Sequence, residues 1–245
     1  MVQPLFFTAL ARQLKPGQNF ILSGDEGKHA ATVKRMRAGE HLQLGDGTGV
    51  RISATVIQNL GSSVELSIDG VEEEALPKLQ LTLVQALAKG DRDELAIQAA
   101  TELGAFSVVP WQANRCISKW DGPKLVRGVA RWQTIVSEAS KQSLRVWTPT
   151  VHSAVDSSQL SDLVQEFDLV LVLDPSASES LKMRIPLEGR VAVVVGPEGG
   201  IDESELSSLE SFGAKRVHLG SGILRTSTAG LAAISAILAF GSAWD

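Results

Sequence analysis

In the first 75 residues, apolar and polar positions alternate in short runs. This period-two pattern is typical of strands with one buried face, and a glycine-rich turn at 45–49 separates two of the runs. One short helix is expected at 26–35. The predicted strands lie at 20–22, 41–44, 51–57 and 63–68. Small strands at this spacing predict a compact β-barrel.

Beyond residue 79, continuous apolar runs alternate with segments of helical periodicity. Strands that are apolar on both faces are typical of a parallel sheet covered by helices on each side. The pattern predicts strands at 79–87, 107–110, 168–173, 190–195 and 217–219 and helices at 91–103, 122–140, from 202 and at 226–240. In the first of these helices we expect burial of Leu95, Ile97, Ala99 and Leu103. The fold class is therefore α/β: a doubly wound, mainly parallel domain preceded by a small barrel.

An acidic run at 72–74, closed by Pro77, separates the two patterns. Charged, proline-containing segments are typical of linkers between domains. We therefore expect a β-barrel domain at 1–75 and an α/β domain at 76–245.

Two glycine-rich turns, at 196–200 and 220–222, each follow a predicted strand of the second domain. Ligands of open parallel sheets bind beyond the carboxyl ends of the strands, and glycine allows the backbone to approach a ligand closely. Neither turn has the spacing of a dinucleotide or P-loop motif. The first turn carries an acid, Glu198, and no lysine, which favours a neutral or cationic ligand over a triphosphate. We predict a pocket for a nucleotide-like cofactor; two ordinary strand-to-helix turns are the alternative.

Composition narrows the classes of protein further. A single cysteine, Cys116, excludes an internal disulfide framework, and four scattered histidines provide no zinc-binding spacing. The N-terminus lacks the pattern of a signal peptide, and the longest apolar run, 229–240, is too short to span a bilayer. We expect a cytoplasmic enzyme with no metal and no membrane partner.

Charge is distributed unevenly along the chain. The formal net charge is −5, but residues 114–145 hold seven basic and two acidic side chains. Non-specific binding to nucleic acid should be weak, whereas this one segment can meet a phosphate backbone. A solvated basic helix face is the alternative interpretation.

Several short motifs follow one another along the chain. They are KRMRAGE at 34–40, LGDG at 44–47, QALAKG at 85–90, IQAATELG at 97–104, NRC at 114–116, RW at 131–132, EASKQSLR at 138–145, VGPEGG at 195–200, LG at 219–220 and ILRT at 223–226. The GPEGG motif, followed later in the chain by LG and ILRT, is a highly specific combination for one protein family. In this order the motifs resemble the RsmE family of SPOUT-superfamily RNA methyltransferases, and the resemblance covers essentially the whole chain.

The resemblance implies methylation of N3 of a specific uridine in 16S rRNA, with S-adenosylmethionine as the methyl donor. It further implies a deep trefoil knot in the α/β domain, a PUA-like RNA-binding barrel, and a homodimer. The partner would be 16S rRNA or the assembled small ribosomal subunit. The apolar helix at 226–240 is expected either in the dimer interface or in the core of one subunit.

The motifs also assign roles to individual residues. The implied cofactor-binding residues are Leu173, Asp174, Gly196, Pro197, Glu198, Gly199, Gly200, Leu219, Gly220, Ser221, Ile223, Leu224 and Thr228. The implied RNA-binding residues are Lys34, Arg35, Arg37, Arg115, Arg127 and Arg131. Glu198 is expected either to attract the sulfonium of the cofactor or to begin a helix.

Three residues are candidates for catalysis. Uridine N3 must lose a proton, and the negative charge that develops spreads onto O2 and O4, where a cationic donor stabilises it. Arg225 is the first candidate for this donor and Arg145 the second. Arginine does not serve as a base at ordinary pH, so the proton acceptor is assigned to Glu138. The alternative role of Glu138 is an ion pair with Arg131 or Arg145.

The chain departs from the family pattern at a few positions. Relatives usually have proline and arginine at Ser221 and Gly222, often glutamate at Ser227 and Lys141, and an arginine near the N-terminus that 4–7 lacks. Loss of two arginines predicts weaker RNA contacts. The alternative functions are methylation of another rRNA or tRNA target and non-catalytic RNA binding. A serine hydrolase acting through Ser221 lacks the G-x-S-x-G spacing.

Overall fold

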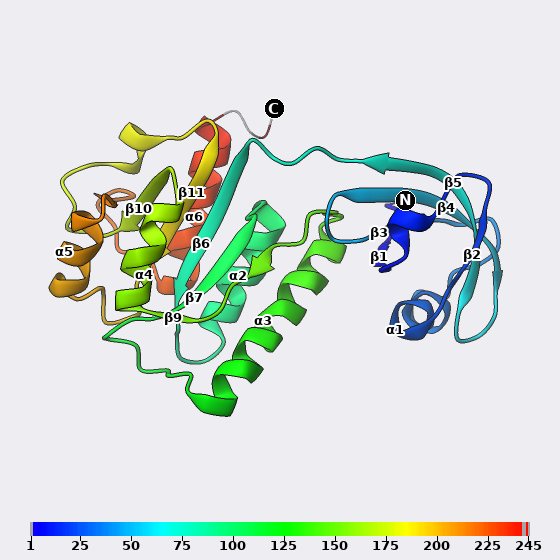
Figure 1. Cartoon of the computed structure of the whole chain (residues 1–245), viewed down its shortest axis with the longest axis horizontal. Coiled ribbons are helices and arrows are strands. Elements are labelled where there is room, and N and C mark those ends of the chain that lie inside the picture. The colour runs from blue at the N-terminus through cyan, green and yellow to red at the C-terminus, as the bar shows by residue number, and fades with distance from the viewer. Residues whose placement is uncertain (1, 242–243, 245) are drawn as a thin grey trace. The chain divides into compact units, whose positions relative to one another are not determined.

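The computed structural model describes residues 2–241 and 244, and the chain divides into two compact units. The smaller unit comprises Met1–Leu76 and Ser140–Thr148, and the larger comprises Pro77–Ala139 and Pro149–Asp245. Figure 1 shows the helices and strands of each unit. Segment 140–148 belongs to the smaller unit although it is distant from the rest of that unit in sequence.

The smaller unit is a five-stranded half-barrel. The strand order is β1-β3-β4-β5-β2, in which β1 pairs in parallel with β3 and the other pairs are antiparallel. The expected small barrel is therefore open, with β1 and β2 at its edges. Two register shifts between β4 and β5 bend these long strands around the core. The elements are β1 (Leu5–Phe7), β2 (Asn19–Leu22), α1 (Gly24–Lys28), β3 (His41–Gly45), β4 (Val50–Asn59) and β5 (Val64–Glu73), with a 3-10 turn at Ala11–Gln13 and a π-helical turn at His29–Val33.

The larger unit is a parallel sheet with helices on both faces. Its strand order is β12-β10-β11-β6-β7-β8, and β9 also pairs with β7. The strands are β6 (Leu79–Ala86), β7 (Ser107–Gln112), β8 (Thr150–Val151), β9 (Val155–Asp156), β10 (Leu169–Leu173), β11 (Gly189–Val195) and β12 (Lys215–Val217). The helices are α2 (Arg92–Leu103), α3 (Gly122–Gln142, which ends in the smaller unit), α4 (Ser157–Leu163), α5 (Glu203–Ser211) and α6 (Thr226–Phe240), with 3-10 turns at Val164–Glu166 and Leu181–Arg184. This is the architecture expected of the α/β domain.

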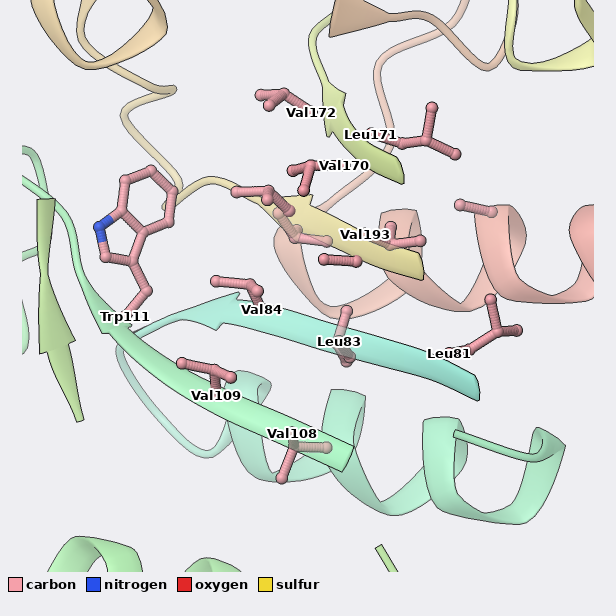
Figure 2. Packing of buried hydrophobic residues seen from close by; sticks show 14 of the residues in the cluster. Leu81, Leu83, Val84, Val108, Val109, Trp111, Val170, Leu171, Val172 and Val193 are labelled. Atoms are coloured by element: carbon pink, nitrogen blue, oxygen red, sulfur yellow. The ribbon is translucent and has the colours of Figure 1, made fainter. Parts of the chain in front are cut away.

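Helices α6 and α4 cover opposite faces of this sheet. Leu83 on β6 faces α6, because a Cβ added at Gly230 would lie 2.7 Å from Leu83 Cδ1. On β7, Trp111 Nε1 donates a hydrogen bond to Ser157 Oγ at the start of α4 (3.3 Å). Leu83 pairs with Val108, three residues before Trp111, so the two side chains point to opposite faces. Figure 2 shows the branched side chains of β6, β7, β10 and β11 packed in the core.

Helix α6 buries its small and branched residues within the larger unit. It packs against α2, β6 and β11, so one face of this apolar helix is core, as one of the two sequence interpretations proposed. The expected burial of Leu95 on α2 is wrong: this side chain is 53% exposed. The reason is the helical phase, because α2 buries the face that carries Asp93, Ala96, Ile97, Ala100 and Thr101.

Between β12 and α6 the chain crosses the loop that follows β10. The His218 amide donates to the Glu179 carbonyl (2.9 Å), and the Leu181 amide donates to the His218 carbonyl (3.0 Å). The chain then enters α6, which returns to β6 and β11. These bonds place the segment after β12 beside the loop that follows β10, in the region where the trefoil knot is expected. Among the described residues, no helix is both long and apolar enough to cross a membrane.

Candidate functional site

A cavity of about 470 Å³ lies beyond the carboxyl ends of β10, β11 and β12. Its volume is in the range of small-molecule binding sites, about 300–1,000 Å³. The lining residues are Arg92, Leu173, Asp174, Pro175, Val195, Gly196, Pro197, Glu198, Gly200, Ile201, Leu206, Val217, His218, Leu219, Gly220, Gly222, Ile223, Leu224, Arg225, Thr226 and Ala229. Both glycine-rich turns therefore contribute to one cavity at the edge where parallel sheets bind ligands.

Most of the cofactor-binding residues expected from the sequence line this cavity, but Gly199, Ser221 and Thr228 do not. The Gly199 carbonyl accepts a hydrogen bond from Arg115 Nη1 (3.3 Å). The Thr228 hydroxyl, on the first turn of α6, donates to the Arg225 carbonyl (3.2 Å). Gly199 therefore contributes to its turn, and Thr228 to the start of α6, from outside the cavity.

Part of the cavity wall is exposed apolar surface. Ile223 is 83% exposed and Leu224 43% exposed, although both are large aliphatic side chains. Apolar lining of this kind with a few polar groups is typical of small-molecule and cofactor sites. Gly196 lets the turn pack closely on Ile201, since a Cβ at position 196 would lie 2.5 Å from Ile201 Cγ1.

Asp174, the residue after β10, is held by an ion pair beside the cavity. Its Oδ2 accepts from Arg216 Nε (2.8 Å), and its Oδ1 accepts from the Ser176 amide (2.9 Å). Burial alone would raise the pKa of Asp174. The hydrogen bonds from Ser176 and Arg216 outweigh burial and lower the pKa below its ordinary value. Asp174 is thus a fixed, ionised acceptor.

Glu198 forms the second ion pair of the cavity. Its Oε1 accepts from Arg92 Nη1 (2.8 Å) and from the Lys89 amide (3.3 Å). Burial would raise the pKa of Glu198, but hydrogen bonds from its own amide, Arg92 and Lys89 lower it. Glu198 does not begin helix α5, because the Asp202 side chain caps that helix.

The three candidate catalytic residues lie in different places. Arg225 lines the cavity and is exposed, and no carboxylate of the described chain lies within 4 Å of its guanidinium. Glu138 is exposed on α3 and does not line the cavity. Arg145 belongs to the smaller unit. Burial lowers the pKa of Arg145, opposed by the charge of Glu74, and its Nε has no hydrogen-bond partner among the described residues.

The residues assigned to RNA binding divide into free and paired cations. Lys34, Arg35, Arg37 and Arg127 are exposed. Arg131, also exposed, binds both carboxylate oxygens of Glu94: Nε lies 3.2 Å from Oε1, and Nη2 lies 2.9 Å from Oε2.

Arg115 likewise has an acidic partner, Asp202 (3.1 Å). Arg115 and Arg131 would thus have to exchange an acidic partner for phosphate.

Sequence reasoning missed several residues that shape the cavity: Gln85, Arg92, Arg216, His218 and Thr226. Arg92 and Arg216 hold the two acids, and the His218 Nδ1 accepts from the Gly220 amide (3.1 Å). Gln85 and Thr226 belong to the motifs at 85–90 and 223–226, and their polar side chains within those motifs were the available indication. No local pattern indicates Arg92 or Arg216, because their partners are 106 and 42 residues away in the chain.

Residues 2–241 and 244 contain no group of three or more His, Cys, Asp or Glu side chains that could hold a metal ion. Cys116 is buried, and burial raises the pKa of its thiol to about 11. The thiol is therefore protonated at neutral pH.

Comparisons with known proteins agree with this architecture. Residues 74–238 match the RNA methyltransferase domain family, and residues 22–66 match the RNA methyltransferase PUA domain family. A structure from Neisseria gonorrhoeae, a ribosomal RNA small subunit methyltransferase E bound to S-adenosylmethionine, has a TM-score of 0.85 and 30% identity, covering 98% of both chains. A Legionella pneumophila protein described as a methyltransferase, with the same cofactor bound, gives a TM-score of 0.86 at 30% identity and the same coverage.

Two curated relatives carry the same name as the Neisseria protein, ribosomal RNA small subunit methyltransferase E. The Mycobacterium bovis protein is 41% identical over 232 residues, covering 92% of this chain and 88% of the relative. The Bacillus subtilis protein is 31% identical over 245 residues, covering 96% of each. With the RNA methyltransferase domain matched over most of its length, this chain belongs to the ribosomal RNA small subunit methyltransferase E family.

Proposed function

We propose that this chain methylates N3 of a specific uridine in 16S rRNA, with S-adenosylmethionine as the methyl donor. The observation that carries the proposal is the single cavity that both glycine-rich turns line at the carboxyl edge of the parallel sheet. The substrate is 16S rRNA, free or in the assembled small ribosomal subunit, and the enzyme acts in the cytoplasm as a homodimer.

The cavity suits the proposed cofactor in shape and in polarity. Ile223 and Leu224 offer uncovered apolar surface for the adenine, and the glycines of both turns let backbone groups approach the adenosyl moiety. Asp174 supplies an ionised acceptor at the end of β10. When bound, S-adenosylmethionine supplies an electrophilic methyl group on a sulfonium; the protein must bind it and orient the acceptor.

In the proposed mechanism Arg225 stabilises the charge of the acceptor base. Removal of the N3 proton leaves negative charge on O2 and O4 of the uracil. Arg225 lines the cavity, is exposed and has no acidic partner in the described chain, so its guanidinium is available to these oxygens. Arg145 is the second candidate for this role.

Glu138 is our candidate for the base that accepts the N3 proton. Its exposed carboxylate on α3 belongs to the family motif at 138–145. Lys34, Arg35, Arg37 and Arg127 supply free cations for RNA phosphates, and Arg115 and Arg131 join them when RNA displaces their acidic partners. Phosphate contacts fix the position of the RNA, and flipping of the uridine brings N3 to the cofactor.

Two measurements test this function. Calorimetry with S-adenosylmethionine should show binding in the micromolar range, and mass spectrometry of 16S rRNA from a deletion strain should show loss of 3-methyluridine. Absence of cofactor binding would favour a non-catalytic RNA-binding protein. Cofactor binding with an unchanged 16S rRNA would point to another rRNA or a tRNA.

Replacement of Arg225 by alanine tests the assigned mechanism. We expect Arg225→Ala to lower kcat by a factor on the order of 100 to 1,000, the effect of removing one preorganised donor, with cofactor affinity roughly retained. Arg190→Ala is the matched control, because Arg190 is an exposed arginine on β11 that does not line the cavity. Undiminished turnover in Arg225→Ala would remove this residue from the mechanism.

A further inference from the structure

A buried chain of hydrogen bonds connects strand β6 to both turns of the cavity. Gln85 on β6 has no exposed surface. Its Nε2 donates to Thr226 Oγ1 (2.9 Å) and to the Ala86 carbonyl (3.1 Å). Thr226 Oγ1 in turn donates to the Gly196 carbonyl (2.8 Å). Thr226 begins α6 directly after Arg225, and Gly196 begins the other turn.

The carbonyl oxygens at both ends of this series of hydrogen bonds determine which atoms donate and which accept. Carbonyl oxygens only accept hydrogen bonds, so the carbonyl of Ala86 requires the amide nitrogen of Gln85 to face it. The same nitrogen then reaches the Thr226 hydroxyl, which must accept from Gln85 and donate its own proton to Gly196. A flipped Gln85 amide would place an oxygen against the Ala86 carbonyl.

This arrangement has a cost for stability. Gln85 Oε1 is buried and has no hydrogen-bond partner among the described residues, and an unsatisfied buried polar atom destabilises a fold. Alternation along β6 places Gln85 on the same face as Leu81 and Leu83, both of which are core residues. A leucine at position 85 would avoid the cost, so packing of the core does not explain the glutamine.

The position of these hydrogen bonds beside the cavity explains why residue 85 is a glutamine. Gly196 and Thr226 both line the cavity but are 30 residues apart. Gly196 begins the turn at 196–200, and Thr226 begins α6, which follows the turn at 220–222. The hydrogen bond from Thr226 to Gly196 joins these two segments directly, and Gln85, by donating to the Thr226 hydroxyl, holds that hydroxyl in the orientation that donates to Gly196. These bonds also fix the first residue of α6, and with it the backbone that carries Arg225.

We propose that Gln85 is a positioning residue, which acts through Thr226 to hold the two turns at the spacing that cofactor binding requires. This inference rests on the proposed function, because the cofactor is the ligand whose affinity reports the spacing.

The test compares cofactor affinity with stability in four variants. Gln85→Leu keeps the volume and removes the amide, and Thr226→Val removes the hydroxyl at nearly constant shape. We expect each to raise the Kd for S-adenosylmethionine about five- to tenfold, the factor that corresponds to one buried hydrogen bond. We expect Gln85→Leu to leave the unfolding temperature unchanged or to raise it. Thr226→Ser should recover most of the affinity. The double variant should bind as weakly as either single variant, because both break the same chain.

A second buried hydrogen bond of β6 provides the matched control. Thr82 is buried on the other face of the strand, and its hydroxyl bonds to Ser107 Oγ (2.6 Å). Thr82→Val should lower the unfolding temperature without changing the Kd. Wild-type affinity in Gln85→Leu, or additive losses in the double variant, would overturn the inference. If the wild-type chain itself does not bind the cofactor, the proposed function fails instead.

Discussion

The centre of the parallel sheet and its carboxyl edge are built from the same strands, but the centre buries apolar side chains whereas the edge carries polar ones. At the centre, Leu83, Leu171 and Val193 have no exposed surface and belong to the apolar core (Figure 2). A few residues further along, the same strands lead to Gln85 and Asp174, whose polar atoms are buried or paired. The centre stabilises the fold, and the edge uses that stability to hold polar groups in place for a ligand.

The two ends of β10 show the same contrast with one residue type. Asp168, before the strand, accepts from the Arg190 amide (2.7 Å) and joins neighbouring strands. Asp174, after the strand, pairs with Arg216 and lines the cavity. The carboxyl end of β10 opens into the cavity, which Asp168 does not line, so we propose ligand binding for Asp174 and a local structural role for Asp168.

The largest effect is expected from a core substitution. Leu171→Ala removes a fully buried side chain from the centre of β10 and should lower the free energy of unfolding by about 2–5 kcal/mol. Urea denaturation measures this change. Cofactor affinity at 25 °C, corrected for the folded fraction, should remain that of the wild type. A large loss of affinity in the folded protein would contradict the separation of centre and edge.

A smaller effect, on binding, is expected at the edge. Asp174→Asn removes a charged acceptor from the cavity and should raise the Kd for S-adenosylmethionine about tenfold or more, since hydrogen bonds to charged groups contribute about 1.5–3 kcal/mol. Asp168→Asn, at the other end of the strand, should leave the Kd unchanged. Calorimetry distinguishes the two. Equal affinities in both variants would remove Asp174 from the site.

The smallest effect is a dependence of stability on pH. The pKa of Asp174 is lower in the folded chain than its ordinary value, so its ionised form stabilises the fold. This contribution is fully present above the unfolded pKa, about 3.9, and is lost as the pH falls through the lower folded pKa. Between pH 5 and pH 2 the free energy of unfolding should therefore fall less in Asp174→Asn than in the wild type. An identical pH profile, measured by urea denaturation, would show that the ion pair with Arg216 contributes nothing to stability.

The apolar pattern of the sequence predicted the longer helices and strands of the larger unit well, because these elements bury their apolar side chains. The last strand was shifted: it was expected at 217–219 and lies at Lys215–Val217. Its first two residues are charged and broke the apolar pattern, yet Arg216 is satisfied there by Asp174. Strands β8 and β9 and helix α4 were not predicted, because two-residue strands and a seven-residue helix carry too little periodicity.

By itself, the sequence determined the fold class, the family motifs and the two turns that line the cavity. These features depend on local periodicity and on glycine, which are readable from neighbouring residues. Only the tertiary structure decided which partners hold the site: Arg216 beside Asp174, Arg92 beside Glu198, and Gln85 behind Thr226. Such pairs join residues far apart in the chain, and their energies depend on distance and burial, which arise only when the strands are assembled into one sheet.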